Sequence, residues 1–203
     1  MTLTPLVLAS GNAGKLREFH QLLAPLDLDV RPQADFWVAD VEETGLTFVE
    51  NALIKAREAS RVSGLAALAD DSGLEVDALK GAPGIFSARY AGEPKSDERN
   101  NARLLNDLID VPEGSRSGRY WCVLVYLRHT DDPVPLIVQR SWEGEILAHP
   151  RGDGGFGYDP VFWLPDQARS AAELSAQEKN HFSHRGRALR ALVEALAEQP
   201  GGS

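Results

Sequence analysis

Apolar and polar residues recur along the chain with two different periods, which predict a mixture of strands and helices. Apolar runs and strict alternation predict strands at residues 6–9, 65–69, 74–78, 121–127, 134–142, 145–148 and 161–164. Apolar residues that recur every three or four positions predict helices at residues 16–23, 47–63 and 96–109, a short one from 170 and a last one from 183. Helices and strands alternate in the first half and strands dominate the second, so the expected fold class is α/β with a mixed sheet.

Two local signals sharpen these boundaries. Thr47 and Glu50 form a capping box, which predicts that a helix begins there, and Gly64 is expected to end it. Glu143 and Gly144 separate two apolar stretches and are predicted to form a turn between two strands.

Composition limits the classes of protein that the chain can belong to. It has 203 residues, which favours one domain, and a net charge of -9, which argues against general nucleic-acid binding. Its single cysteine, Cys122, excludes an internal disulfide framework and lies in an apolar strand, where an inert thiol is expected. No window of 18 apolar residues and no targeting segment is visible, so we expect a cytoplasmic protein without a membrane partner.

The charges are grouped rather than scattered. Two acidic stretches, at residues 35–50 and 70–77, contain no Lys or Arg, whereas residues 179–190 contain four bases and no acid after Glu178. Carboxylates suit Mg²⁺, and Lys and Arg suit phosphate oxygens, so the grouping favours a site where Mg²⁺ meets phosphates. The alternative is that each of the three charged groups simply lies on a solvent-exposed face of the protein.

A glycine-containing turn joins the first strand to the first helix. It reads Ser10-Gly11-Asn12-Ala13-Gly14-Lys15. Backbone N–H groups at a helix N-terminus bind anions, and Lys15 can reach a phosphate as a point charge. The spacing is neither that of a P-loop nor that of a dinucleotide-binding motif, and an ordinary turn with a surface lysine remains the alternative.

Two pairs of acids are candidates for metal and proton chemistry. Asp70 and Asp71 follow a predicted buried strand, where one could hold a metal and one could accept a proton from water. Neighbouring residues in extended structure point to opposite sides, so only one is expected to face the metal. Turn-forming residues are the alternative, as a solvated acidic turn is for Glu42 and Glu43.

Two later motifs combine polar groups with aromatic or basic ones. In the stretch 154–160, Phe156 or Tyr158 could stack on a base and Asp159 could accept a hydrogen bond from it, although a hairpin loop is the alternative. In Ser183-His184-Arg185-Gly186, a base in the first turn opposes the helix dipole, which a nearby phosphate or base carbonyl would explain. A capped helix with exposed bases is the simpler reading.

Taken together, these motifs resemble the inosine triphosphate pyrophosphatase family, and within it the bacterial-type dITP/XTP pyrophosphatases. The resemblance extends from about Leu6 to Leu196. Six motifs carry it in order: Ser10-Gly11-Asn12-x-Gly14-Lys15, Glu42-Glu43-Thr44-Gly45, Asp70-Asp71-Ser72-Gly73-Leu74, Gly81-Ala82-Pro83-Gly84, Phe156-Gly157-Tyr158-Asp159-Pro160, and Lys179-Asn180 with Ser183-His184-Arg185-Gly186.

The resemblance implies a fold, an activity and a set of partners. It implies a long, curved mixed sheet flanked by helices, as a single domain over residues 1–203 with two lobes, a cleft between them and a tail at 199–203. It implies Mg²⁺-dependent hydrolysis of ITP, dITP and XTP to the monophosphate and pyrophosphate, which cleanses the nucleotide pool. It also implies a homodimer.

The resemblance also assigns roles to residues. Asp71 corresponds to the proton acceptor and a metal ligand, Glu42 to the second metal ligand, and Glu43 to its support. The residues that correspond to substrate contacts are Ser10, Gly11, Asn12, Ala13, Gly14, Lys15, Ser72, Phe156, Gly157, Tyr158, Asp159, Lys179, His184 and Arg185. Two alternatives are a Maf-like nucleotide pyrophosphatase with other substrates and a non-catalytic nucleotide-binding protein.

Overall fold

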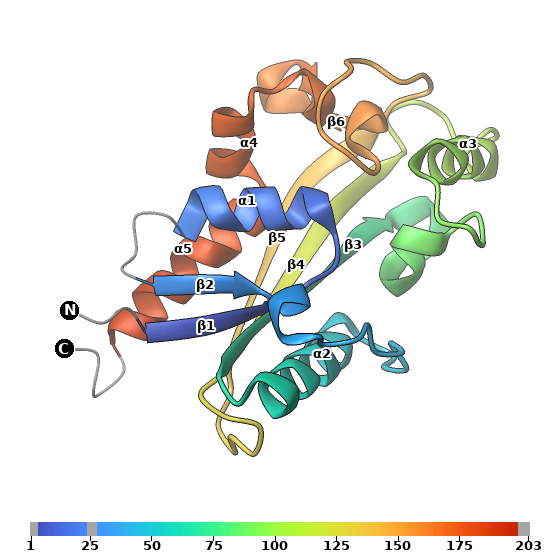
Figure 1. Cartoon of the computed structure of the whole chain (residues 1–203). Helices are drawn as coiled ribbons and strands as arrows, with labels where there is room; N and C mark the ends of the chain where they lie inside the picture. The colour runs from blue at the N-terminus through green and yellow to red at the C-terminus, as the bar shows by residue number, and fades with distance from the viewer. Residues whose placement is uncertain (1–3, 24–27, 199–203) are drawn as a thin grey trace. The chain divides into compact units, whose positions relative to one another are not determined.

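A computed structural model describes residues 4–23 and 28–198, so the expected tail at 199–203 lies outside the described residues. Its strands are β1 (Thr4–Ala9), β2 (Leu28–Pro32), β3 (Ala66–Val76), β4 (Ser117–Leu127), β5 (Leu136–Ile146), β6 (Phe162–Leu164) and β7 (Arg169–Ser170). Its α-helices are α1 (Ala13–Leu23), α2 (Phe48–Ser63), α3 (Asp97–Asp107), α4 (Ala176–Phe182) and α5 (His184–Ala197). Short 3-10 helices connect several of them (Figure 1).

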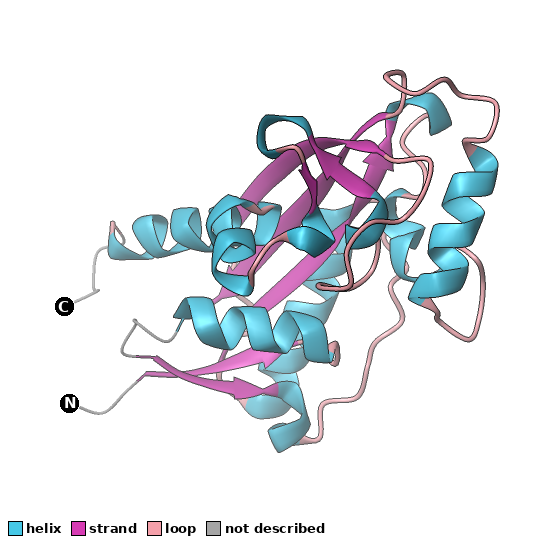
Figure 2. Cartoon of the chain, turned by 90° about the horizontal axis from the view of Figure 1, so that it is seen from above, coloured by secondary structure: helices cyan, strands magenta, loops and turns pink. Residues whose placement is uncertain are grey.

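The strands form one seven-stranded sheet in the order β2-β1-β3-β4-β5-β6-β7. β1 pairs in parallel with β2 and with β3, whereas β6 pairs antiparallel with β5 and β7. Helices accompany the strands (Figure 2). The predicted α/β class with a mixed sheet is therefore confirmed.

The chain divides into two compact units. The first comprises the described residues up to Asp71, Cys122–Arg140 and those from Arg185 onward; the second comprises Ser72–Trp121 and Ser141–His184. β3, β4 and β5 each contribute residues to both units. The described chain contains no helix that is long and apolar enough to cross a membrane.

In the first unit, helices cover both faces of the strands. Leu6 and Leu8 of β1 face a cluster that includes residues of α1 and α5, whereas Val7 and Ala9 face a cluster that includes α2. This alternation is the period-two pattern of a strand that is buried on both faces. Figure 1 shows α2 on the opposite side of β1 from α1 and α5.

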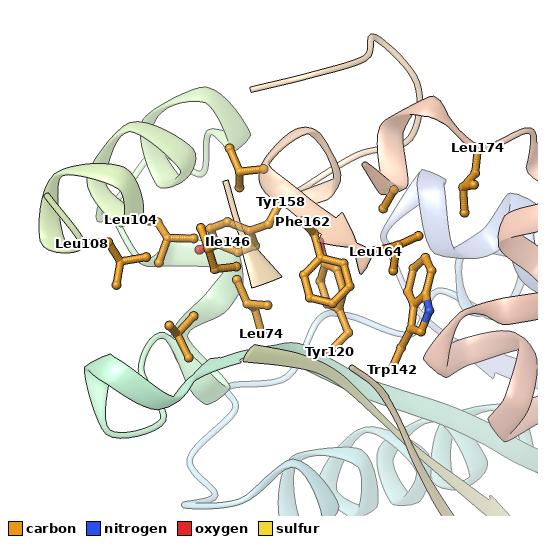
Figure 3. Close-up of a cluster of buried hydrophobic side chains, with 13 residues drawn as sticks. Leu74, Leu104, Leu108, Tyr120, Trp142, Ile146, Tyr158, Phe162, Leu164 and Leu174 are labelled. Carbon is orange, nitrogen blue, oxygen red and sulfur yellow. The ribbon is translucent and has the colours of Figure 1, made fainter. Parts of the chain in front are cut away.

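In the second unit, aromatic side chains dominate the core. Tyr120, Trp142 and Phe162 pack together, with ring centroids of Tyr120 and Phe162 4.6 Å apart (Figure 3). Leu104 and Leu108 pack into this core and so hold α3 against it. Ile109, which we expected to face inward with them, is 71% exposed because α3 ends at Asp107.

Two predicted breaks between strands are wrong. Residues 65–69 and 74–78 belong largely to one continuous strand, β3, so Asp70 and Asp71 lie inside a strand and not at its end. β5 likewise runs without a turn through Glu143 and Gly144. A Cβ on Gly144 would lie 2.5 Å from the carbonyl oxygen of Trp163 in β6, so this glycine permits close packing of strands and does not form a turn.

The boundaries of α2 agree with the sequence, whereas the helix predicted from residue 170 is wrong. The capping box of Thr47 and Glu50 is present, and Gly64 ends α2 in the left-handed conformation. The capping box at Ser170 opens only a 3-10 turn, Ala171–Glu173. The separate helix α4, which Ser175 caps at its N-terminus, was not predicted.

Candidate active site

The turn before α1 is shorter than the sequence suggested. α1 begins at Ala13, so Gly14 and Lys15 lie in its first turn. The Asn12 side chain accepts a hydrogen bond from the backbone N–H of Lys15 at 3.0 Å, which is the geometry of an N-cap. The Ser10 hydroxyl accepts from the N–H of Asn12 at 3.2 Å. The predicted anion-binding turn is therefore ordered by its own polar side chains.

Asp70 connects this turn to α5. Its carboxylate lies 3.0 Å from the Lys15 ammonium and 3.3 Å from the Arg185 guanidinium, and it is 1% exposed. Burial opposes the charged form of Asp70, but the two cations outweigh burial and hold its pKa well below the usual range. Asp70 is thus a buried anion that fixes the positions of Lys15 and Arg185.

Asp71 points to a different set of partners. Its Oδ1 lies 2.7 Å from Nζ of Lys55 in α2, and the same nitrogen lies 2.8 Å from Oε1 of Glu43. Two carboxylates from distant parts of the chain therefore share one ammonium group. The expectation that Asp70 and Asp71 would face different sides is confirmed by these partners.

Charge and burial act in opposite directions at this second cluster. Burial raises the pKa of Asp71, and the ammonium of Lys55 offsets that effect only in part. Burial disfavours the charged form of Lys55, but the nearby carboxylates, Asp71 first, outweigh it and raise the Lys55 pKa. Lys55 therefore stays charged between the two carboxylates.

α2 also fixes the acidic turn that carries Glu43. The Asn51 side chain, which is fully buried, accepts a hydrogen bond from the backbone N–H of Gly45 at 2.8 Å. A Cβ on Gly45 would lie 2.6 Å from Cβ of Glu50, so only glycine allows this approach. Asn51 and Lys55 are four residues apart and share one helix face.

The second unit holds a separate polar cluster. Asp159 accepts a hydrogen bond from Lys179 Nζ at 2.6 Å and another from the backbone N–H of Phe156 at 2.8 Å. The Lys179 ammonium lies 4.3 Å from the centroid of the Phe156 ring. Lys179, a predicted substrate contact, thus lies against Phe156 and Asp159 of the predicted base-recognition loop. The roles of these residues stay a prediction.

His184 and Arg185 are more buried than a pair of direct substrate contacts would suggest. His184 is 4% exposed, and its ring stacks on Tyr120 with centroids 4.7 Å apart. Arg185 is 2% exposed and pairs with Glu18 as well as with Asp70. Their predicted role as substrate contacts stays a prediction.

Within the described residues, the two predicted metal ligands have different surroundings. Glu42 is exposed, and no hydrogen bond or ion pair in the described chain engages its side chain. Its neighbour Glu43 makes the contact to Lys55. No group of three or more His, Cys, Asp or Glu residues poised for a metal is found in the part of the chain that the structure describes.

The sequence analysis missed Lys55. The available signal was its spacing, because Asn51 and Lys55 are two polar residues four apart on the otherwise alanine-rich face of α2. Lys55 also follows a long acidic stretch as its first base. The structure pairs Lys55 with the carboxylates of Glu43 and Asp71.

Comparison with known proteins is decisive for the family. The sequence pattern of the Ham1 family matches residues 6–195 of this chain. The chain belongs to the Ham1 family. The predicted resemblance is thereby confirmed across nearly the whole chain.

Relatives within the Ham1 family are similar over nearly their full length. A dITP/XTP pyrophosphatase of Shigella flexneri is 57% identical over 94% of this chain and 96% of its own length. The dITP/XTP pyrophosphatase of Escherichia coli strain K12 is 55% identical with the same coverage. A HAM1 protein from Coxiella burnetii has a similar structure, with a TM-score of 0.90, 50% identity and coverage of 97% of this chain and all of its own.

Proposed function

We propose that this chain hydrolyses the triphosphates of deaminated purines, ITP, dITP and XTP, to the nucleoside monophosphate and pyrophosphate. The observation that carries the proposal is the pair of carboxylates on Lys55, in the same unit as the glycine-containing turn before α1. Ham1 relatives more than half identical to this chain are named dITP/XTP pyrophosphatases. A catalytic role therefore fits better than that of a non-catalytic nucleotide-binding protein.

The donor set suits a divalent metal, which nucleotide pyrophosphatases generally need. Asp71 and Glu43 already bring their oxygens within 2.8 Å of one cationic nitrogen. Carboxylate oxygens are the ligands that Mg²⁺ prefers. We assign Mg²⁺ to Asp71 and Glu42, with Glu43 in support through Lys55. When bound, Mg²⁺ would neutralise charge that develops on the phosphates.

The residues of the chain perform the remaining steps. Asp71 orients a water molecule and accepts its proton at a carboxylate oxygen, and its raised pKa makes it a stronger base. Lys55 holds Asp71 in place and adds positive charge beside the reacting phosphates. Lys15, with the turn from Ser10, binds the triphosphate. Positioning and electrostatic stabilisation supply most of the rate enhancement.

The second unit is assigned to the purine base. The Phe156 ring offers a stacking surface, and Asp159 and Lys179 offer an acceptor and a donor next to it. Deaminated purines carry a keto oxygen where adenine carries an amino group. A backbone N–H near His184 and Arg185 would donate to the keto oxygen and would be left without an acceptor opposite the amino group of adenine. Ser72 and Tyr158 complete the assigned contacts.

A product assay tests the proposal directly. The full chain is given ITP, dITP, XTP, GTP and ATP separately with Mg²⁺, and pyrophosphate and orthophosphate are both quantified. We expect pyrophosphate from the first three and almost no turnover of GTP and ATP. Orthophosphate as the direct product would refute the assigned cleavage, and preference for other nucleotides would favour a Maf-like activity.

The remaining assignments concern the state of the protein. We propose a homodimer, as the family resemblance implies, and a location in the cytoplasm, as we expect from the sequence. Light scattering after size exclusion should give twice the 22.1 kDa of one chain. A mass of one chain at micromolar concentration would refute the dimer without affecting the assigned reaction.

A further inference from the structure

Both backbone groups of Gly157 are held by side chains of α3. The Gly157 N–H donates to Oδ2 of Asp97 at 2.7 Å, and its carbonyl accepts from Nδ2 of Asn101 at 2.8 Å. Asp97 and Asn101 are four residues apart at the start of α3, so they lie on the same helix face. Two side chains of α3 therefore bind the N–H and the carbonyl of one residue in the loop 154–159.

The neighbouring residues of the loop are held by other groups. The Phe156 N–H donates to Asp159, and the Tyr158 hydroxyl donates to the backbone carbonyl of Ser87 at 2.8 Å. At Gly157, by contrast, both backbone groups bond to side chains of α3. The Gly157 φ of +63° is one that residues with side chains rarely adopt, so the peptide bonds beside it can rotate readily once the two hydrogen bonds are lost.

α3 is itself firmly anchored. Asn100, which is 2% exposed, donates to the backbone carbonyls of Ser87 and Ala88 and accepts from the N–H of Ala91. Leu104 adds a buried apolar contact with the core. The helix is thus a fixed support against which the loop can be positioned.

Asp97 and Asn101 take no part in the hydrogen bonds by which Asn100 anchors α3. Asp97 is exposed, and its hydrogen bond to Gly157 is open to solvent. Asn101 uses Nδ2 for Gly157, whereas its Oδ1 is buried without a hydrogen-bond partner in the described chain. The two side chains are better placed to position the loop than to stabilise the fold.

We propose that Asp97 and Asn101 are positioning residues for purine recognition. By fixing Gly157 they hold the ring of Phe156 next to Lys179, where it can stack on a base. This inference rests on the proposed function, because it assigns the loop to the purine base. Loss of either hydrogen bond should weaken base binding and leave the chemistry at the phosphates intact.

Kinetics of full-length variants test the inference. Asp97→Ala and Asn101→Leu each remove one hydrogen bond, and we expect KM for ITP to rise about fivefold with kcat within about twofold. Inhibition by inorganic tripolyphosphate, which has no base, should not change. Asp97→Asn retains a hydrogen-bond acceptor and should keep the KM of the wild type. Glu98→Ala and Asn106→Leu, at exposed positions of the same helix, are the matched controls.

Amide hydrogen exchange gives a readout independent of activity. The Gly157 N–H should exchange faster in Asp97→Ala and Asn101→Leu than in the controls. Faster exchange with an unchanged KM for ITP would overturn the inference, as would a fall in kcat alone. Wild-type protein that does not hydrolyse ITP would overturn the proposed function and this inference together, whereas an active wild type with unaffected variants would overturn only the inference.

Discussion

At the scale of residues, the two adjacent aspartates carry different tasks. Asp70 binds Lys15 and Arg185 and is held as an anion, whereas Asp71 shares Lys55 with Glu43 and has a raised pKa. The difference arises from alternation along one strand, which sends the two side chains to opposite faces. The raised pKa therefore supports Asp71, and not Asp70, as the proposed base.

Replacement of the proposed base should separate chemistry from binding. In Asp71→Asn the amide cannot accept a proton at neutral pH, so turnover of ITP should fall by at least about a thousandfold. Nucleotide binding, measured by calorimetry with inosine monophosphate, should change little. Turnover close to that of the wild type would show that another group activates the water.

Lys55 should matter nearly as much, although the sequence analysis did not single it out. Lys55→Gln keeps a hydrogen-bond donor but removes the charge shared by Asp71 and Glu43. We expect kcat to fall about a hundredfold, in line with the loss of one electrostatic contact to a transition state. Lys80→Gln, in the second unit, is the control and should keep the wild-type kcat.

Arg185 should prove to be important for stability. Arg185→Met leaves the buried carboxylate of Asp70 without one of its two cations, which should lower the free energy of unfolding by about 3 kcal/mol. Urea denaturation measures the change, with the exposed Arg187→Met as the control. Unaltered stability combined with a raised KM would instead make Arg185 a direct substrate contact.

At the scale of elements, both ends of α2 were predictable from the sequence, whereas the continuity of β3 and β5 was not. The signals at Thr47, Glu50 and Gly64 act through hydrogen bonds within a few residues, so the local sequence suffices. The role of Gly144 depends on Trp163 of another strand, and no local pattern contains that contact. The same limit applied to Lys55, whose partners are 12 and 16 residues away.

The cap of α2 offers a test at this scale. Thr47→Ala removes the acceptor for the Glu50 N–H, so the free energy of unfolding should fall by about 1 kcal/mol. Urea denaturation of the full chain measures it, and Thr44→Ala, at an exposed position just before the helix, should have a much smaller effect. Equal losses in both variants would mean that the cap contributes nothing specific.

At the scale of the whole molecule, the sequence predicted the class of fold and the family. It did not predict how the candidate site residues group together in space. The α/β mixed sheet and the Ham1 family membership are confirmed. Motifs such as 10–15 and 154–160 predicted candidate substrate contacts, which stay predictions. Their grouping into clusters within each unit depends on tertiary contacts, for example those of Lys179 with Phe156 and Asp159.

The proposed metal dependence is tested on the whole enzyme. Treatment with EDTA should abolish hydrolysis of ITP, and added Mg²⁺ should restore it. Glu42→Gln should raise the Mg²⁺ concentration needed for half-maximal rate on the order of tenfold, because one ligand is lost. Full activity in EDTA would remove the metal from the mechanism, and an effect confined to Glu43→Gln would transfer the ligand role to Glu43.

The position of Asp70 and Asp71 inside β3 has a consequence for mutational tolerance. Deletion of one residue from the strand just before them would turn each carboxylate to the opposite face, toward the other's partners. Deletion of two residues would preserve the faces and shift the carboxylates along the strand by about 7 Å. Single-residue insertions and deletions in this segment should therefore be lost under selection, whereas those in surface loops should persist.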